Sequence, residues 1–230
     1  MHIHFKMYLP PGISACLSQS GAYSIRHLFV LIAAIALVAA CGKVEEEVLL
    51  PGSRVLALGD SLTAGVGVTP DEAWPSLLAN RTGWVVINGG VSGDTSGAAL
   101  QRLQELLEEH KPVLVLVTLG GNDMLRHLPQ QETIANLGQI LAQIKVHGAK
   151  PVLLATPKPS VAGAVLRNLS AADFYREVAD EHQVQLIEDA VAEVLSDPQM
   201  KGDPLHPNAR GHVLLAEKLI DSMKSIGYVR

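Results

Sequence analysis

The sequence predicts an α/β fold in which a five-stranded parallel sheet carries helices on both faces, a three-layer, flavodoxin-like arrangement. Short apolar runs alternate along the chain with segments whose apolar residues recur at helical spacing. The apolar runs are continuous, as in parallel strands that are buried on both faces. The chain has 230 residues, of which 48% are hydrophobic and 18% are charged, so one sizeable core is expected.

Five short apolar runs are the expected strands. The first ends at Gly59, and the third follows Pro112, which ends the helix before it. The third run has the most strand-like composition, and the fifth is the weakest. In chain order the expected strands are residues 54–58, 85–87, 113–117, 151–154 and 184–187.

Five helices are expected between and after these strands. In the second helix, leucines recur at helical spacing from Leu100 to Leu107. In the fourth, Ser170 and Asp173 have the spacing of a helix-capping pair. The expected helices are residues 73–80, a segment around residues 100–107, and residues 134–146, 171–182 and 209–224.

The N-terminal segment has the composition of a signal peptide. Residues 1–41 contain no Asp or Glu and include an apolar run from Leu28 to Ala40. This run of thirteen residues is shorter than the roughly 18 residues that span a bilayer, but it fits the apolar region of a signal peptide. It leads into Val38-Ala39-Ala40-Cys41-Gly42, which resembles the lipobox of bacterial lipoproteins.

The lipobox resemblance implies that residues 1–40 are a lipoprotein signal peptide and that Cys41 becomes a lipid-modified N-terminus. Gly42, rather than aspartate, after the cysteine implies delivery to the outer membrane, on its periplasmic side. The alternative is an ordinary cleavage site with a coincidental cysteine. We expect residues 41–52, with three glutamates, to form a tether, and residues 53–230 to form a single domain.

Composition argues against several classes of function. The net charge is −5 and no block of Lys or Arg is present, so we expect no nucleic-acid partner. Two cysteines cannot supply a disulfide scaffold or a four-thiolate zinc site. The loops lack the Gly-x-Gly-x-x-Gly and Gly-Lys-Ser/Thr motifs that cradle phosphates, which argues against a nucleotide-binding protein.

Polar, glycine-rich motifs follow the first three expected strands, and a fourth polar motif precedes the last helix. In parallel sheets, sites form outside the carboxyl ends of the strands. A nucleophilic serine needs a base to take its proton and a third group to orient that base. Glycines let backbone N–H groups approach a ligand, as an oxyanion hole requires. The motifs are Gly59-Asp60-Ser61-Leu62, Ser92-Gly93-Asp94, Gly120-Gly121-Asn122-Asp123 and Asp203-Pro204-Leu205-His206.

Each motif alone has a structural explanation, such as a helix cap or an Asx turn, and a lone Asp-x-x-His is a weak signal. The order and spacing of all four together indicate a hydrolase. They resemble the four sequence blocks of the SGNH (GDSL-type) hydrolases, over nearly all of residues 54–224. Residues 91–95 and 119–123 are most similar to the periplasmic thioesterase, lysophospholipase and arylesterase group of Gram-negative bacteria.

The resemblance implies that residues 53–230 form an SGNH hydrolase domain that works through an acyl-enzyme on Ser61. His206 is the implied general base, and Asp203 is the residue that orients it. The backbone N–H groups of Ser61 and Gly93 and the side-chain amide of Asn122 are the implied oxyanion hole. No metal or cofactor is implied. We expect a small acyl-ester substrate and a monomer.

Other polar residues near the motifs are expected to have supporting roles. Asp60, Asp94 and Asp123 are expected to hold their loops through hydrogen bonds, and His127 is a candidate for substrate contact. Residues 156–163 have no clear counterpart in the family and are expected to border the acyl pocket. Three histidines near helix ends are expected to be solvated, namely His110, His147 and His182.

The favoured interpretation is an esterase that acts on lysophospholipids, aryl or short-chain esters and thioesters. An O-acetylesterase for envelope polysaccharide is an alternative, although a 4% aromatic content provides few rings to stack on sugars. A non-catalytic envelope lipoprotein that uses the fold as a binding module is an alternative from another class. The presence of Ser61, Asp203 and His206 together argues against that last alternative.

Overall fold

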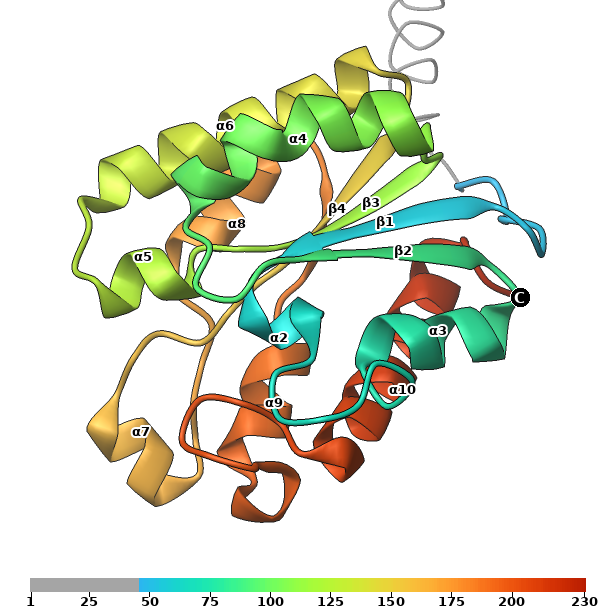
Figure 1. Cartoon of the computed structure of the whole chain (residues 1–230). Coiled ribbons are helices and arrows are strands. Elements are labelled where there is room, and N and C mark those ends of the chain that lie inside the picture. Colours follow the sequence, from blue (N-terminus) through green and yellow to red (C-terminus); the bar gives the residue numbers. More distant parts are fainter. Residues whose placement is uncertain (1–45) are drawn as a thin grey trace, which may run out of the picture. The chain divides into compact units, whose positions relative to one another are not determined.

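The computed structural model describes residues 46–230, which form a single parallel sheet covered by helices (Figure 1). The strand order is β2-β1-β3-β4-β5, and every neighbouring pair is parallel. The predicted fold class is therefore confirmed. The strands are β1 (Arg54–Gly59), β2 (Val85–Gly90), β3 (Leu114–Thr118), β4 (Lys150–Leu154) and β5 (Gln185–Ile187).

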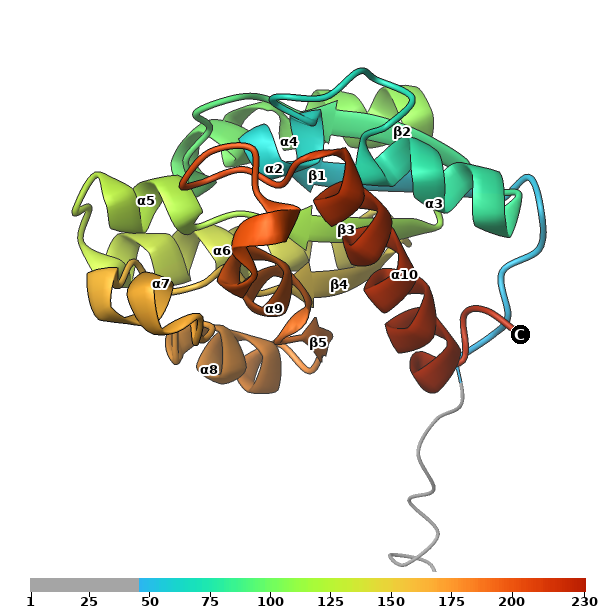
Figure 2. The ribbon, with the colours of Figure 1, turned by 90° about the horizontal axis from the view of Figure 1, so that it is seen from below.

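Two helical layers cover the sheet because successive side chains of a strand point to opposite faces. On β1, Val55 and Ala57 pack into one buried cluster, while Leu56 and Leu58 pack into the other. Figures 1 and 2 show the two layers on opposite sides of the strands. The first cluster includes α3 (Trp74–Thr82), α9 (Ala190–Ser196) and α10 (Ala209–Ile226), and the second includes α4 (Ser96–His110), α6 (Gln130–Val146) and α8 (Phe174–Glu181).

The sheet register brings three of the predicted motifs to one edge. Gly59, the last residue of β1, pairs with Gly90 at the end of β2 and with Thr118 at the end of β3. All three strands run in the same direction, so the loops that follow them begin side by side. This edge is where the sequence places its glycine-rich motifs.

The fourth predicted helix begins later than the sequence suggests. It starts at Phe174 rather than at residue 171, and Asp173 occupies the N-cap position without a side-chain hydrogen bond. Ala171 instead forms an antiparallel bridge with Pro157, and the C=O of Ser170 accepts the N–H of Lys158. The expected Ser170–Asp173 cap is therefore wrong, because this segment pairs with the loop after β4.

Several short helical segments were not predicted. They are 3–7 residues long, too short for a repeating pattern of apolar residues to identify them. Besides α9, they are α2 (Ser61–Ala64), α5 (Gly121–Leu125), α7 (Val161–Leu166) and the 3₁₀ turn η1 (Pro198–Met200).

The described part of the expected tether packs against the domain. The N–H of Leu49 donates to the C=O of Tyr228 at 2.9 Å, and the indole N–H of Trp84 donates to the C=O of Leu49 at 3.3 Å. Residues 46–52 therefore belong to the folded unit. The predicted signal peptide, residues 1–40, and Cys41 lie outside the described residues. Within residues 46–230, no helix is both long and apolar enough to cross a bilayer.

Candidate active site

Ser61 is the first residue of α2, the short helix that directly follows β1. Asp60 caps this helix: its Oδ1 accepts the N–H of Leu62 at 2.9 Å. The helix packs tightly against the strand ends, and a Cβ at Gly59 would lie 2.1 Å from Oγ1 of Thr63. The glycine before Asp60-Ser61 is therefore required by this close approach.

His206 links Ser61 to Asp203 through its two ring nitrogens. Nε2 of His206 lies 2.9 Å from Oγ of Ser61, and Nδ1 lies 2.7 Å from Oδ2 of Asp203. The serine and histidine are 145 positions apart in the chain. The structure thus brings together all three residues that the sequence assigns to the nucleophile, the base and the orienting carboxylate.

Asp203 is fixed by the turn on which it lies. Its Oδ1 accepts the backbone N–H groups of Leu205 at 2.7 Å and His206 at 2.9 Å, which leaves Oδ2 for the imidazole. The hydrogen bonds from the His206 ring and from Leu205 stabilise the carboxylate and lower the pKa of Asp203. This carboxyl group therefore stays ionised at neutral pH.

The His206 turn is attached to the start of α10. Asn208 caps that helix by accepting the N–H of Gly211 at 3.0 Å. Its side-chain nitrogen donates to the carbonyl oxygens of Gln199 and Lys201. One asparagine therefore holds together the helix, the η1 turn and the loop that carries His206.

The expected oxyanion donors lie beside Ser61. Gly93 follows β2 with a φ of 83°, a left-handed conformation that glycine adopts without strain. Among the described residues, no hydrogen bond uses the backbone N–H of Ser61 or of Gly93. The amide nitrogen of Asn122 donates to the C=O of Asp94 at 2.9 Å and to Oδ2 of Asp60 at 3.2 Å.

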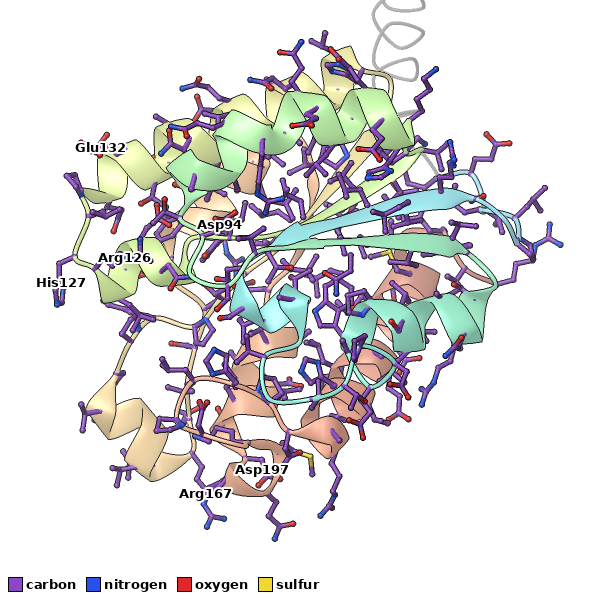
Figure 3. The ribbon with its side chains drawn as sticks, viewed as in Figure 1. Asp94, Arg126, His127, Glu132, Arg167 and Asp197 are labelled. Atoms are coloured by element: carbon purple, nitrogen blue, oxygen red, sulfur yellow. The ribbon has the colours of Figure 1, made fainter. Side chains whose placement is uncertain are left out.

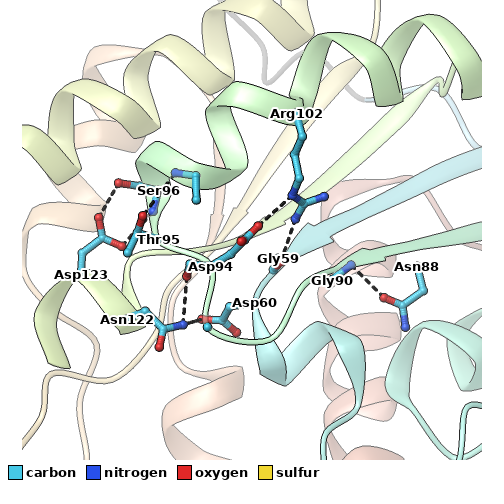
Figure 4. A network of polar contacts seen from close by, with 12 residues as sticks. Gly59, Asp60, Asn88, Gly90, Asp94, Thr95, Ser96, Arg102, Asn122 and Asp123 are labelled. Atoms are coloured by element: carbon cyan, nitrogen blue, oxygen red, sulfur yellow. Dashed lines mark hydrogen bonds and ion pairs between the residues drawn. The ribbon is translucent and has the colours of Figure 1, made fainter. Parts of the chain in front are cut away.

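A polar network ties the three loops together (Figure 4). Nε of Arg102, on α4, contacts the Asp94 carboxylate at 2.7 Å, and an Nη atom donates to the C=O of Gly59. Asp123 accepts the backbone N–H of Ser96 at 2.9 Å and the Ser96 hydroxyl at 2.5 Å. These contacts fit the loop-holding roles expected for Asp94 and Asp123. The sequence did not predict Arg102, because no motif marks a residue eight positions after Asp94.

Asp60 is a buried carboxyl group, with 2% of its surface exposed. Burial raises its pKa to about 6, although the Leu62 N–H bond and the nearby His206 both lower it. A carboxylate is costly to bury unless it accepts hydrogen bonds, and here each oxygen accepts one, from Leu62 and from Asn122.

A pocket of about 420 Å³ opens at Ser61 and His206. Its volume lies within the range of small-molecule sites. As expected, residues 156–161 form part of its wall, and Gly93 and Asn122 lie on it as well. Two apolar residues that sequence reasoning missed, Leu169 and Leu195, line it too, because only the fold brings them there. Its apolar wall is formed by Leu62, Leu125, Pro157, Pro159, Val161, Leu169, Leu195, Pro204 and Leu205.

The other histidines differ from expectation in part. His127 does not line the pocket, and its side chain lies at the outer edge of the domain (Figure 3). The position of this side chain therefore does not support His127 as a candidate for substrate contact. His147 is exposed, as expected, but His110 and His182 are half-buried. The His182 ring packs against α6, where a Cβ at Gly138 would lie 2.5 Å from Nε2.

Among residues 46–230, no three His, Cys, Asp or Glu side chains are grouped so that they could hold a metal ion. The reactive groups at the pocket are the Ser61 hydroxyl and the His206 imidazole, which are hydrogen-bonded to each other. Beside them lie the backbone N–H groups of Ser61 and Gly93, which have no protein acceptor among the described residues, and the side-chain amide of Asn122. That set of groups suits acyl transfer.

Comparison with known proteins agrees with this geometry. Residues 57–214 match the model of the GDSL-like lipase/acylhydrolase family. An arylesterase from Vibrio mimicus is 38% identical over 71% of this chain and 84% of its own length. The thioesterase 1/protease 1/lysophospholipase L1 of Escherichia coli K12 is 37% identical over 75% of this chain and 84% of its own length.

A solved structure also resembles the chain closely. It is the psychrotrophic esterase EstA from Pseudoalteromonas sp., inhibited by monoethylphosphonate, with a TM-score of 0.65 and 28% identity. The match covers 75% of this chain and 97% of EstA. From its sequence and its fold alike, the chain belongs to the GDSL-like lipase/acylhydrolase family.

Proposed function

We propose that this chain hydrolyses carboxylic ester and thioester bonds of acyl substrates through an acyl-enzyme on Ser61. The observation that carries the proposal is the hydrogen-bonded series from Ser61 through His206 to Asp203 at the mouth of an apolar pocket. A serine alcohol is a weak nucleophile until a base removes its proton, and this arrangement supplies the base.

The reaction proceeds in two halves. Nε2 of His206 takes the Ser61 proton as Oγ attacks the carbonyl carbon, and the carbonyl oxygen becomes an oxyanion. The imidazolium then gives its proton to the departing alcohol or thiol, leaving the acyl group on Ser61. A water molecule attacks this ester with His206 again as base, and the carboxylic acid leaves as Ser61 regains its proton. Asp203 keeps the second ring proton on Nδ1 throughout.

Three donors stabilise the oxyanion in this proposal: the N–H groups of Ser61 and Gly93 and the side-chain amide of Asn122. The two backbone donors are free of protein acceptors among the described residues. Loss of one oxyanion donor typically costs about 10²–10³-fold in turnover.

The apolar lining of the pocket favours an acyl chain as the group bound next to Ser61. The printed names of the relatives, an arylesterase and a thioesterase/lysophospholipase, point to the same substrate class. We therefore propose lysophospholipids, aryl esters and acyl thioesters as substrates.

A panel of p-nitrophenyl esters from acetate to palmitate, with an acyl thioester and an acetylated glycan, tests this proposal. We expect hydrolysis of medium and long acyl chains and a fall of about 10⁴–10⁶-fold in kcat for Ser61→Ala. Ser225→Ala, on the exposed face of α10, is the matched control and keeps wild-type rates. Activity confined to acetyl groups, or full activity in Ser61→Ala, would contradict the proposal.

We also propose that the protein is exported and held, as a monomer, on the periplasmic side of the outer membrane by acyl chains on Cys41. The support is the apolar run before Cys41 and the small residues that lead into it. Cys41→Ser is expected to move the protein from the membrane fraction to the soluble fraction. Unchanged membrane association would contradict the lipid anchor, and light scattering on the released form tests the monomer.

A further inference from the structure

The amide nitrogen of Asn122 donates to two different acceptors (Figure 4). One is the backbone C=O of Asp94 at 2.9 Å, and the other is Oδ2 of Asp60 at 3.2 Å. An amide side chain can be turned over, which exchanges its nitrogen and oxygen with little change in shape. Two acceptors on one side of the amide determine that its nitrogen is the atom placed there.

Asp60 is suited to this contact because it can only accept hydrogen bonds when it is ionised. Each of its two oxygens accepts one hydrogen bond. Oδ1 accepts the N–H of Leu62, and Oδ2 accepts the side-chain amide of Asn122. The carboxyl group is buried, so solvent has little access to replace either bond. The titratable groups near it are Asp94, His206 and Tyr175. Of these residues, only Asp94 also accepts from the amide, and it does so through its backbone C=O.

We infer that Asp60 is a positioning residue for the oxyanion hole, in which it holds the amide nitrogen of Asn122 toward the reacting carbonyl. The inference rests on the proposed function, because it needs an oxyanion at this place. The 3.2 Å contact lies at the long end of the normal range for N–H···O bonds, so this N–H can be shared with an oxyanion in the pocket while the Asp60 contact is kept. The contacts with Asp60 and with the C=O of Asp94 together keep the amide oriented.

Asparagine cannot replace Asp60 in this role, although the two side chains have the same shape. Asparagine has one acceptor oxygen, while the site contains two donors, the Leu62 N–H and the Asn122 amide. In Asp60→Asn, one of the two contacts becomes a clash between donors. Serine at this position still caps α2, because its hydroxyl accepts the Leu62 N–H, but it is too short to reach Asn122.

A double-mutant cycle tests whether Asp60 acts through Asn122. We expect Asp60→Asn to lower kcat by about ten- to a hundredfold with little change in KM, because a misplaced catalytic group costs this much. In an Asn122→Ala background, where the amide is absent, the same substitution is expected to change kcat by less than about threefold. If Asp60→Asn does not fold, Asp60→Ser takes its place. The same pattern is then expected: a fall in kcat in the wild-type background and little change in the Asn122→Ala background.

Thr63→Val is the matched control, since Thr63 is buried in the same short helix and is not a hydrogen-bond partner of Asn122. Its effect on kcat is expected to be small and equal in both backgrounds. Equal losses from Asp60→Asn or Asp60→Ser in the two backgrounds would overturn the inference, because Asp60 would then act independently of the amide. A wild-type kcat in Asn122→Ala would instead contradict the oxyanion hole of the proposed function.

Discussion

At the scale of single residues, the Asp203 turn decides which tautomer His206 adopts. Two backbone N–H groups donate to Oδ1 of Asp203, so only Oδ2 is left to face the imidazole. An ionised oxygen at that place keeps the proton on Nδ1 and leaves Nε2 free to accept the proton of Ser61. The role of His206 as a base toward Ser61 therefore depends on Oδ2 of Asp203 being an acceptor.

Asp203→Asn is expected to reverse this tautomer. The backbone N–H groups of Leu205 and His206 donate to the amide oxygen of the new asparagine. Its amide nitrogen must therefore face Nδ1 of His206 and donate to it. Nε2 then carries the proton and cannot act as a base toward Ser61. The side chain of Asp203 is 49% exposed, so we expect a fall in kcat on the order of 10³-fold, somewhat less than the roughly 10⁴-fold of a buried triad aspartate.

The control is Asp197→Asn, since Asp197 accepts the N–H of Gln199 at 2.9 Å in a similar turn but faces no histidine. It is expected to keep the wild-type kcat. Steady-state kinetics on a p-nitrophenyl ester measures both variants. An Asp203→Asn enzyme within about threefold of wild type would show that this aspartate does not set the tautomer.

Much of the site was predictable at the residue scale, because its residues lie in short motifs that can be recognised in the sequence. Ser61, Gly93, Asn122, Asp203 and His206 were assigned from the resemblance of four ordered motifs to the sequence blocks of the family. The contact of Asp60 with Asn122 was not predictable, because no motif marks a hydrogen bond between the two loops that carry these residues. His127 was only a candidate, because nearness to Asn122 in sequence says nothing about the direction of its side chain, and it does not line the pocket.

At the scale of secondary-structure elements, the long apolar runs and the long periodic helices were predictable and the short helices were not. β3 is buried at every position, so its sequence is continuously apolar. α7 has six residues, and its three large apolar side chains are strongly exposed, so they form no repeating buried pattern that would identify it. Its local signal is the cap, in which the Ser160 hydroxyl accepts the N–H of Gly163.

A hydrogen bond between α3 and α10 was also not predictable from the sequence. The N-cap of α3, Ala73, makes no side-chain hydrogen bond, and the N–H of Trp74 instead donates to Nδ1 of His212 on α10 at 3.3 Å. His212 is fully buried, and burial lowers its pKa to about 4 from an ordinary value of 6.5. The neutral ring is therefore the form that the fold requires.

This link predicts a specific pH dependence of stability. Between pH 6.5 and 4 the unfolded chain takes up a proton at residue 212 and the native protein does not, so the free energy of unfolding falls as the pH falls. The contribution of the neutral His212 ring to the free energy of unfolding is fully present above pH 6.5. Roughly 3 kcal/mol of this contribution is lost by pH 4.

His212→Asn is the variant that isolates this effect, because its side-chain oxygen can still accept the Trp74 N–H but does not titrate. Urea unfolding at pH 7.5 and pH 5 is expected to show a smaller loss of stability in His212→Asn than in the wild type. His212→Ala, which also leaves a cavity, is expected to lose about 2–4 kcal/mol at pH 7.5. An identical pH dependence in wild type and His212→Asn would contradict a neutral buried His212.

At the scale of the whole molecule, the topology explains how the two ends of the domain form one site. β1 is an inner strand of the sheet, and α10 packs against α3, in the layer on one side of that strand. Ser61 follows β1 and His206 precedes α10, so both lie at the carboxyl edge of the sheet. The alternation of strands and helices predicted that the motifs lie at this edge of the sheet. The hydrogen bond between the side chains of Ser61 and His206 joins the two ends of the domain in one site.

Covalent labelling by a fluorophosphonate tests whether Ser61 and His206 act as one unit. A single adduct on Ser61 is expected, found by mass spectrometry of the digested protein. In His206→Ala the labelling rate is expected to fall by about 10³-fold or more, because the base that activates the serine is gone. An adduct on another residue, or a labelling rate that does not depend on His206, would show that the two residues do not act together.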